Sequence, residues 1–555
     1  MTVYLVNRTR LRSPEDGAHK NQPAKLHREK YHPFKPIHVH ELNEDDPDSY
    51  LHNPGKEPLV PWNTAHLIDR AAEKWGQREA LVSMHQGHRF TFHQIKEQPG
   101  DRLGLWGPNS SQWYLTFLAA ARAGLILVNI NPAYQLSELH YCLSKVGVKV
   151  LIADEAFKTQ KYHEMITSIV PELLISEPGQ LDSKQLPDLK SVVIISENNL
   201  QGAYRFKDVH NYGTPELISQ VCKQLKHEIQ PDEGCNLQFT SGTTGQAKAS
   251  LLTHYSTINN MMFVGSRLHL NIRICLQVPC FTDSGTCLDF WTSLCYGSAL
   301  VINQDPSFNI AESLRAIEEE SCTLIYGTPT MFVDFIAKAK ESNRKLNSLE
   351  MALVAGAPVS GELIMDLKQT TGIKKVYGGY GMTETSPISF FTLPTDSNEK
   401  VTSTVGFIME HIEAKVVDEN GKMVPFGKPG ELWVRGYGNM LCYWRDEART
   451  KETIGEDRWL KTGDQFVLHE DGYGAVVGRI KDMIIRGGEN IFPKEIEHFL
   501  ERHPDILEVL GIPDARMGEE VCACIRLNKG SSITAENIKE YCKGKVSTIQ
   551  TPWRI

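Results

Sequence analysis

The sequence has no CxxC pair and no His/Cys spacing typical of a metal site, although it contains 12 cysteines in 555 residues. The scattered cysteines argue against a disulfide framework and against a zinc site, and they fit a reducing compartment. Cys522 and Cys524 lie two residues apart in a mostly apolar run. This period-two spacing predicts that both pack on one face of a β-strand.

The sequence also lacks an uninterrupted hydrophobic run long enough to span a membrane. Its longest apolar stretch, residues 113–130, is interrupted by Arg122 and Gly124, where a helix would give way to a strand. Basic residues are not in excess, because 59 Lys and Arg face 68 Asp and Glu and the formal net charge is -9. Since the two signs are interspersed, we expect neither a nucleic acid nor an anionic membrane surface as the main partner.

The length of the chain predicts two unequal domains, because 555 residues can bury one large core and a smaller one. Residues 1–31 carry Arg8, Arg10, Arg12 and Arg28 against only three acidic residues, which is the charge bias of an organelle-targeting segment. A disordered extension is the alternative interpretation.

Helices alternate with short apolar strands from about residue 58 onward. Residues 311–320 are predicted to be a helix, residues 322–326 a strand, and residues 329–339 a second helix. Thr328 would cap that second helix, and Pro329 would occupy its first position. This βαβ pattern predicts an α/β fold in which helices cover parallel sheets.

A different pattern marks the end of the large domain. Residues 466–479 predict a β-hairpin that turns at Asp471-Gly472. The charged pair Lys481-Asp482 follows directly and is a candidate hinge. Beyond it, a Gly-rich turn, a helix at residues 493–502 and further strands are enough for a small α+β domain.

A strand at residues 237–239 leads into a loop of small hydroxyl residues and glycines. The loop consists of Thr240, Ser241, Gly242, Thr243, Thr244, Gly245, Gln246, Ala247 and Lys248. Backbone N–H groups and hydroxyls of such a loop can surround phosphate oxygens, while the lysine supplies positive charge. The glycine spacing does not match the common G-x-x-x-x-G-K-[ST] loop, and a surface turn is the alternative interpretation.

This loop resembles the signature of the AMP-forming adenylating superfamily, which includes acyl-CoA synthetases, luciferases and peptide-synthetase adenylation domains. Other segments agree with that superfamily in order and spacing, and the resemblance covers roughly residues 59–545. These segments are Tyr326–Pro329, Gly356–Pro358, Tyr380–Glu384, Pro429–Glu431, Thr462–Asp464, and Gly478-Arg479 running on to Gly487–Asn490. Within the superfamily, residues 131–134, 326–334 and 516–524 are similar to the mitochondrial medium-chain acyl-CoA ligases.

The resemblance implies an α/β fold with two domains behind an N-terminal extension. Residues 1–58 would be the extension, with a candidate targeting segment. Residues 59–479 would be the AMP-binding adenylation domain, built of βαβ sheets with a small β-barrel-like portion. Residues 480–555 would be a small, mobile α+β C-terminal domain, truncated here.

The resemblance also implies a reaction and its partners. A fatty acid of medium chain length would react with ATP to give acyl-AMP and pyrophosphate, and coenzyme A would then take the acyl group. The partners would be these small molecules together with Mg²⁺, and the oligomeric state is left open. The implied location is the mitochondrial matrix, with the cytoplasm as the alternative.

The resemblance implies catalytic roles for Lys248, Thr243 and Glu384. Negative charge accumulates when the α-phosphorus is attacked, and the loop, Lys248 and a magnesium ion would offset it. Glu384 would be the carboxylate on the Mg²⁺ side, since hard cations prefer oxygen ligands. An ordinary glutamate at a helix start is the alternative for Glu384.

The remaining roles concern the nucleotide and coenzyme A. Gly356 would line the nucleotide site, and Tyr380 would offer a flat face to adenine. Asp464 would bind the ribose hydroxyls, and Arg479 would reach the ribose and the α-phosphate. Lys481 would be the hinge, and Gly487, Gly488, Glu489 and Asn490 would face the active site and the pantetheine tunnel. The alternative for Tyr380 is a core aromatic, for Asp464 and Arg479 ordinary surface residues, and for Gly487-Gly488 a tight turn.

The chain departs from the family pattern in the phosphate loop and before residue 101. Ala247 and Ala249 stand where the family usually has proline and glycine, and a positive φ at Ala249 would cost about 1 kcal/mol. The short link between residues 92–95 and 101–105 predicts that one helix is deleted near residues 96–100, because a parallel crossover needs a dozen or more residues.

Two further departures concern the acyl pocket and the C-terminus. Thr282 stands where close relatives have a histidine that lines the acyl pocket. The sequence stops at residues 553–555, before the family's C-terminal lysine motif, and neither Lys543 nor Lys545 matches that lysine. The alternative function is therefore a nucleotide-binding protein with impaired adenylation, and delivery of the acyl group to a carrier protein is a third, weaker interpretation.

Overall fold

The structure is a computed structural model, and it describes most of residues 48–480. The described ranges are 48–96, 103–212, 214–240, 247–268, 272–282, 290–303, 309–342, 344–357 and 359–480, with shorter segments between 484 and 542. All of them belong to one compact unit that spans residues 33–555. Within the described ranges, no helix combines the length and the apolar character that a membrane span requires.

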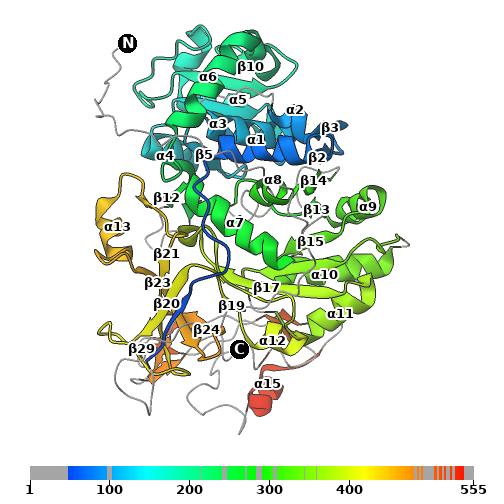
Figure 1. The fold of residues 1–555 in the computed structure, drawn as a ribbon, viewed down its shortest axis with the longest axis vertical. Coiled ribbons are helices and arrows are strands. Elements are labelled where there is room, and N and C mark those ends of the chain that lie inside the picture. Colours follow the sequence, from blue (N-terminus) through cyan, green and yellow to red (C-terminus); the bar gives the residue numbers. More distant parts are fainter. Residues whose placement is uncertain are drawn as a thin grey trace, which may run out of the picture. The chain divides into compact units, whose positions relative to one another are not determined.

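A nine-stranded sheet is the largest in the structure (Figure 1). Six neighbouring strands, from β17 to β2 in the sheet order, run parallel, and antiparallel strands flank them at both edges. The order is β19 (Phe407–Ile408), β18 (Ile388–Phe391), β17 (Lys375–Gly381), β16 (Met351–Ala355), β15 (Leu324–Gly327), β13 (Arg273–Leu276), β14 (Ala299–Ile302), β2 (Glu79–Ser83) and β3 (His88–Thr91).

Three helices cover one face of this sheet, namely α9 (Ile310–Glu320), α10 (Pro329–Glu341) and α11 (Gly361–Thr371). Leu314, Phe332 and Ile364 of these helices share one buried core with strand residues such as Ile325 and Val376. The predicted alternation of helix, strand and helix is confirmed here. Thr328 caps α10 through a hydrogen bond from the Met331 N–H to its Oγ1 at 3.4 Å.

An eight-stranded sheet lies earlier in the chain. Its order is β10 (Tyr204–Arg205), β9 (Ser191–Ile195), β6 (Val150–Asp154), β4 (Gly104–Trp106), β5 (Leu127–Ile130), β11 (Gly234–Thr240), β12 (Lys248–Thr253) and β22 (Cys442–Tyr443). The strands from β10 to β11 run parallel, whereas β12 and β22 are antiparallel to their neighbours. Helices α4 (Leu136–Val146) and α5 (Tyr162–Ile169) pack on this sheet.

The apolar stretch at residues 113–130 belongs to this second sheet and its helices. It forms α3 (Ser111–Arg122) and then β5, with a turn at Gly124, whose φ is +71°. The predicted change from helix to strand near Arg122 and Gly124 is confirmed. Further α-helices are α1 (Thr64–Trp75), α2 (Phe92–Lys96), α6 (Pro215–Glu228), α8 (Thr292–Tyr296), α12 (Asn398–Ser403) and α13 (Glu447–Thr453).

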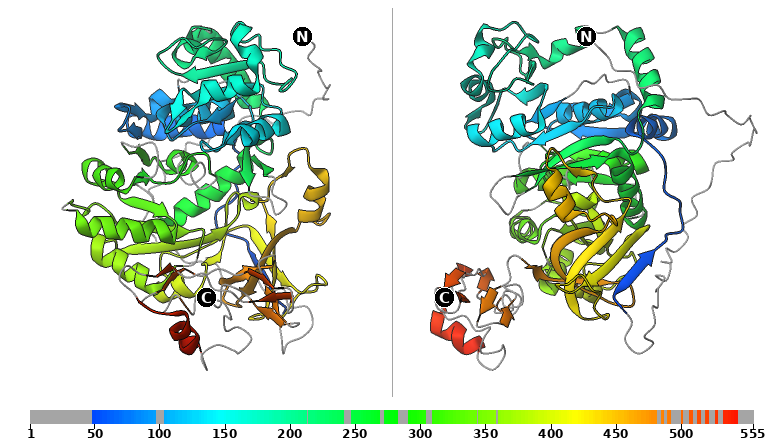
Figure 2. Two further views of the ribbon diagram at one scale, coloured as in Figure 1. Left: turned by 180° about the vertical axis from the view of Figure 1, so that it is seen from behind. Right: turned by 90° about the vertical axis from the view of Figure 1, so that its left-hand side faces the viewer.

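A five-stranded antiparallel sheet corresponds to the small barrel-like portion of the prediction. Its order is β1 (Tyr50–Asn53), β20 (Ile412–Val417), β21 (Pro429–Gly436), β23 (Leu460–Leu468) and β24 (Gly474–Arg479). The predicted hairpin is confirmed as β23 and β24, and Gly472 in its turn has φ +87°. Strand β1 lies within the predicted N-terminal extension, so residues 50–53 add an edge strand to this sheet. Figure 2 shows the yellow and orange strands of this sheet, with the blue β1 at its edge, beside the green strands of the nine-stranded sheet.

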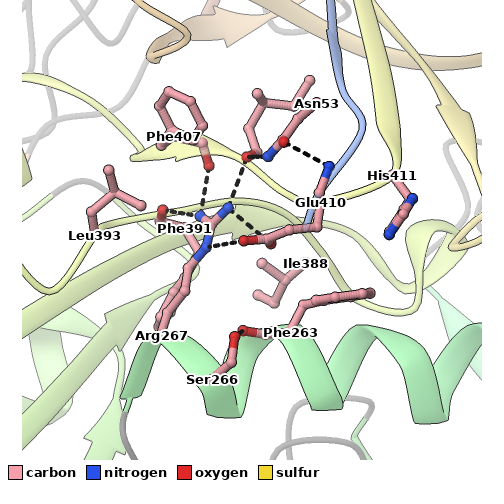
Figure 3. A network of polar contacts seen from close by, with 12 residues as sticks. Asn53, Phe263, Ser266, Arg267, Ile388, Phe391, Leu393, Phe407, Glu410 and His411 are labelled. Atoms are coloured by element: carbon pink, nitrogen blue, oxygen red, sulfur yellow. Dashed lines mark hydrogen bonds and ion pairs between the residues drawn. The ribbon is translucent and has the colours of Figure 1, made fainter. Parts of the chain in front are cut away.

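Helix α7 (His254–Leu268) contacts β12 of the eight-stranded sheet and β18 of the nine-stranded sheet, and lies between them (Figure 1). Near its end, the buried Arg267 reaches across to the strands, as Figure 3 shows. Its guanidinium donates to the carbonyl oxygens of Phe391, Phe407 and Ile408 and pairs with Glu410 at 3.0 Å. These bonds fix the end of α7 to β18 and β19.

The helix expected to be deleted near residues 96–100 was inferred from a crossover rule that does not apply here. Strand β3 pairs with β2 in the nine-stranded sheet, whereas β4 pairs with β5 and β6 in the eight-stranded sheet. The short α2 therefore connects two sheets rather than two parallel neighbours of one sheet. The deletion itself stays a prediction, since residues 97–102 lie outside the described ranges.

The segments beyond residue 480 contain both strands and a helix, as predicted for that part of the chain. A four-stranded antiparallel sheet has the order β26 (Glu489–Ile491), β25 (Ile484–Arg486), β29 (Gly518–Glu520) and β28 (Ile512–Asp514), and β27 (Ile506–Glu508) pairs with β30 (Arg526–Leu527). Helix α15 spans Ala535–Cys542. The predicted hinge at Lys481, most of the predicted helix at residues 493–502, and Cys522 and Cys524 lie outside the described residues.

Candidate active site

Three of the sequence motifs meet at one edge of the nine-stranded sheet. The parallel neighbours β15, β16 and β17 end at Gly327, Ala355 and Gly381, and the motif residues Thr328, Gly356 and Glu384 follow these ends. In open α/β sheets, ligands bind outside the carboxyl ends of parallel strands. The topology therefore places the motifs where such a fold holds its ligand.

Gly356 is constrained by its backbone rather than by lack of space. Its φ is +84°, in the left-handed region that favours glycine. Among the described residues, a Cβ atom at this position would meet only Thr328 Cγ2, at 3.7 Å. The chain can therefore turn sharply directly after β16, at the edge where the motifs meet.

Glu384 is buried, with 5 % of its surface exposed, in a short 3₁₀ turn spanning Thr383–Thr385. Its Oε1 accepts a hydrogen bond from the Tyr443 hydroxyl at 2.7 Å and a longer one from Thr240 Oγ1 at 3.4 Å. Its backbone carbonyl accepts from the Met440 N–H at 2.8 Å. Two segments of the chain, one at Thr240 and one at residues 440–443, therefore hold Glu384 in place.

The two ends of the predicted phosphate loop lie beside Glu384. Thr240 and Lys248 are partners across the β11–β12 ladder, and Lys248 Nζ lies 4.9 Å from the centroid of the Tyr443 ring. The Ala247 carbonyl accepts a hydrogen bond from the Tyr141 hydroxyl at 2.9 Å. The loop residues between these ends, Ser241, Gly242, Thr243, Thr244, Gly245 and Gln246, lie outside the described residues.

Ala249 does not have the positive φ that would strain its backbone. Ala249 lies within β12 opposite Phe239, only 1 % of its surface is exposed, and its φ is not positive. Its carbonyl accepts the Trp444 N–H at 2.8 Å, next to Tyr443. A small side chain suits this buried strand position, so the departure from glycine carries no backbone penalty.

A second polar cluster joins the nine-stranded sheet to the five-stranded sheet. Tyr380 donates its hydroxyl hydrogen to Asp464 Oδ2 at 2.7 Å, and Arg479 Nε lies 3.2 Å from Asp464 Oδ1. Asp464 and Arg479 are partners in the β23–β24 ladder, which brings them together. Burial and the Asp464 carboxylate hold the pKa of Tyr380 well above its usual value, so the phenol stays a donor.

The exposure of these residues differs. The Asp464 side chain is 7 % exposed and the Arg479 side chain 52 % exposed, so the carboxylate is buried and the guanidinium reaches solvent. The Tyr380 ring lies 5.5 Å from the Phe466 ring, centroid to centroid. The prediction for Tyr380 considered only its flat face, whereas its hydroxyl is the group that contacts Asp464.

Two residues of the site carry no role in the sequence-based prediction. Tyr443 lies in the two-residue strand β22, which has no periodicity to reveal it. Glu431 stands in one of the motifs, but its contact with the Gly463 N–H at 3.1 Å depends on the pairing of β21 with β23. A motif can mark such a residue without showing what it touches.

The other predicted positions are placed only in part. Thr282 donates its hydroxyl to the Pro279 carbonyl at 2.8 Å, and residues 283–289 after it lie outside the described ranges. Glu489 and Asn490 lie in β26, with Asn490 opposite Ile485. Lys481, Gly487 and Gly488 are outside the described residues.

The sequence matches the family model described as AMP-binding enzyme over residues 68–444. The chain is 42% identical over 525 residues to the medium-chain acyl-CoA ligase ACSF2, mitochondrial, of Danio rerio, a match that covers 91% of this chain and 86% of the relative. The Homo sapiens ligase of the same name is 40% identical over 527 residues, covering 91% and 85%. A putative acyl-CoA synthetase of Bacillus subtilis, YngI, is 34% identical and is covered to 93% of its length.

Solved structures agree with this fold. The anthranilate CoA ligase AuaEII in complex with anthranoyl-AMP superimposes with a TM-score of 0.76 at 25% identity, covering 90% of this chain and 93% of that one. ATP-bound MatB from Rhodopseudomonas palustris has the same fold, with a TM-score of 0.72 at 22% identity and coverage of 88% and 94%. The predicted mixed α/β architecture with several sheets is therefore confirmed.

Proposed function

The chain belongs to the AMP-binding enzyme family, and on this basis we propose that it is an AMP-forming acyl-CoA ligase. A carboxylate oxygen of a fatty acid attacks the α-phosphorus of ATP, and pyrophosphate leaves to give acyl-AMP. The thiol of coenzyme A then attacks the acyl carbonyl, and AMP leaves. Free carboxylates are poor electrophiles because of their charge and resonance, so the AMP leaving group makes the second step accessible.

One observation carries the proposal: both ends of the phosphate loop lie beside a buried carboxylate. Thr240 contacts Glu384 directly. Lys248 lies over the ring of Tyr443, whose hydroxyl donates to Glu384. Hydroxyl donors and a lysine at the loop ends suit the charge that develops on phosphate during nucleotidyl transfer. Ser241 to Gln246 would complete the phosphate site between these ends.

The carboxylate of Glu384 is suited to bind a magnesium ion. Its hydrogen bonds within the described part of the chain come from two hydroxyl groups, and burial of a carboxylate favours a nearby cation. No group of three or more His, Cys, Asp or Glu side chains is arranged around a metal position among the described residues. This suits Mg²⁺, which binds one or two carboxylates together with substrate phosphates and offsets their charge.

The second cluster would hold the nucleoside. Asp464, oriented by Tyr380, would accept hydrogen bonds from the ribose hydroxyls, and the exposed Arg479 would reach the α-phosphate. Gly356 would let the backbone approach the base at the end of β16. A swing of residues 480–555 about Lys481 would then bring Gly487, Gly488, Glu489 and Asn490 to the coenzyme A side.

We infer the length of the acyl chain and the cellular location from the relatives. The ligases from Danio rerio and Homo sapiens are named medium-chain and mitochondrial, so a medium-chain fatty acid and the mitochondrial matrix are proposed here as well. Separation of mitochondria from cytosol, followed by immunodetection of the chain, tests the location. None of the comparisons supports the alternative of an inactive nucleotide-binding protein.

Release of pyrophosphate and consumption of the coenzyme A thiol test the activity. Wild type with Mg²⁺, ATP and fatty acids of increasing length should release AMP and pyrophosphate in equal amounts, with a maximum at medium length. K248M should lower the rate about 100-fold, by loss of charge at the developing oxyanion. K374M, at a lysine whose side chain is 78 % exposed before the start of β17, is the matched control and should leave the rate unchanged. Formation of ADP in place of AMP would refute the proposal.

A further inference from the structure

Tyr443 contacts both a negatively and a positively charged residue of the candidate active site, Glu384 and Lys248. Its hydroxyl donates to Glu384 Oε1 at 2.7 Å, and the face of its ring lies 4.9 Å from Lys248 Nζ. Only 3 % of its surface is exposed. One buried side chain therefore touches the cation of the phosphate loop and the carboxylate on the metal side.

The backbone of Tyr443 is fixed on two sides. Strand β22 pairs with β12, so Tyr443 lies opposite Ser250, two residues after Lys248. The Tyr443 N–H donates to Thr450 Oγ1 at 2.9 Å, and that hydroxyl donates in turn to the Asp446 carbonyl at 2.8 Å. The ring therefore has little freedom to move away from its two neighbours.

Tyr443 gives Lys248 and Glu384 each a contact that is not the oppositely charged residue. Lys248 and Glu384 form no ion pair with each other among the described residues, because the lysine contacts the aromatic face and the carboxylate accepts the phenol hydrogen. A direct ion pair would satisfy both groups and would compete with phosphate for Lys248 and with a metal cation for Glu384. Cation–π and hydroxyl contacts are weaker, so ligands can replace or extend them.

We propose that Tyr443 is a positioning residue that keeps Lys248 and Glu384 apart, so that the first stays available to phosphate and the second to Mg²⁺. The inference rests on the proposed function of these two residues. It assigns separate tasks to the two parts of one side chain. The hydroxyl orients the carboxylate, and the ring prevents the ion pair.

Two substitutions separate these tasks. Y443F keeps the ring and removes the hydroxyl, so it should raise the Mg²⁺ concentration for half-maximal activity about tenfold, with the KM for fatty acid unchanged. Y443L removes the ring as well and permits the ion pair, so it should also raise the KM for ATP. A loss of folded protein would lower kcat and would not shift the Mg²⁺ dependence.

Y473F is the matched control. The Tyr473 hydroxyl also donates to a carboxylate, Asp396 Oδ1 at 2.5 Å, and the residue is 9 % exposed, but it lies in the β23–β24 turn away from the motif residues. This variant should keep the Mg²⁺ dependence of wild type. In an E384Q background, Y443F should add little further shift, because the hydroxyl acts through the carboxylate.

The outcomes distinguish this inference from the proposed function. Wild-type turnover with equal Mg²⁺ dependence in wild type and Y443F overturns the positioning role and leaves the ligase activity standing. Absence of acid-dependent pyrophosphate release from wild type overturns the ligase activity. Calorimetric titration with MgATP then still tests the inference without turnover, since equal affinities of wild type, Y443F and Y443L overturn it and a graded loss supports it.

Discussion

Glu431 accepts a hydrogen bond from the backbone N–H of Gly463 at 3.1 Å, directly before Asp464 in the chain. The other carboxylate oxygen of Glu431 accepts from Trp433 Nε1 at 2.7 Å, so the glutamate is itself held in place. Gly463 has φ +71°, and the Asp464 N–H donates to Thr462 Oγ1 at 3.1 Å. The turn that presents Asp464 is therefore fixed by a residue on the neighbouring strand.

E431A should weaken ATP binding about tenfold, because a lost hydrogen bond to a charged acceptor costs about 1.5 kcal/mol or more and the Asp464 turn loosens. The KM for ATP and calorimetric binding measure the effect. E413A is the control, since Glu413 of the adjacent strand β20 pairs with Arg435 at 2.6 Å rather than with the turn. Equal ATP affinities of E431A and E413A would contradict the role of Glu431.

Arg479 offers a second prediction, in which stability and activity separate. Its guanidinium is 52 % exposed, so water screens its attraction to the buried Asp464, and a screened pair contributes about 0–1 kcal/mol to folding. In an R479M variant, Asp464 keeps the hydrogen bond from the Tyr380 hydroxyl. R479M should therefore leave the thermal unfolding midpoint near that of wild type. Adenylation should nevertheless fall about 100-fold if the guanidinium stabilises charge at the α-phosphate.

R315M serves as the control for R479M. Arg315 pairs with Glu319 one turn along α9, also on the surface. Both the midpoint and the rate should match wild type in this variant. A rate for R479M as high as that of R315M would assign Arg479 to the surface rather than to the nucleotide.

The sequence was sufficient to predict the parts of the site that depend on local patterns and on topology. The alternation at residues 311–339 predicted β15 and its flanking helices, and parallel strands place the residues after their ends at one edge. The contact between Tyr443 and Glu384 joins residues 59 positions apart through a two-residue strand, and the contact between Glu431 and Gly463 joins residues 32 apart. Long-range register of this kind has no local signal in the chain.

Register between strands also explains why the sequence could not reveal the first strand of the five-stranded sheet. Tyr50 in β1 donates its hydroxyl to Glu413 at 2.7 Å, across 363 positions of the chain. A four-residue segment beside a charged N-terminal stretch shows no pattern that distinguishes it from an extension. Its place is fixed only by its partner β20.

The buried pair of Arg267 and Glu410 leads to a prediction about stability (Figure 3). Arg267 is fully buried and Glu410 is 6 % exposed. R267M leaves the carboxylate without its guanidinium and removes the donors to Phe391, Phe407 and Ile408. Removing one partner of a buried pair costs about 3–5 kcal/mol, so the midpoint of urea unfolding should fall clearly.

The double variant R267M/E410L tests the cause of that loss. It removes both charges, so it should recover part of the stability that R267M loses, because no buried carboxylate is left without the Arg267 guanidinium. R344M, at a partly exposed pair with Glu318, is the control and should change the midpoint little. A double variant less stable than R267M would show that the lost carbonyl contacts, and not the charge, dominate.

His254 at the start of α7 leads to a prediction about pH. Its ring is fully buried with Nδ1 2.7 Å from Thr64 Oγ1, and burial lowers the pKa of His254 to about 3. The unfolded chain has the ordinary histidine pKa of about 6.5, so between these values it binds a proton that the native state does not. The stability of the native state is therefore complete above pH 6.5 and falls by about 1.4 kcal/mol per pH unit below it.

H254N removes the titrating group while keeping a polar side chain. Between pH 7 and pH 5, wild type should lose about 2 kcal/mol more unfolding free energy than H254N, because only wild type has this proton uptake in the unfolded state. Urea unfolding at the two pH values measures the difference. Equal pH slopes for wild type and H254N would mean that the His254 ring is protonated in the native state as readily as in the unfolded chain.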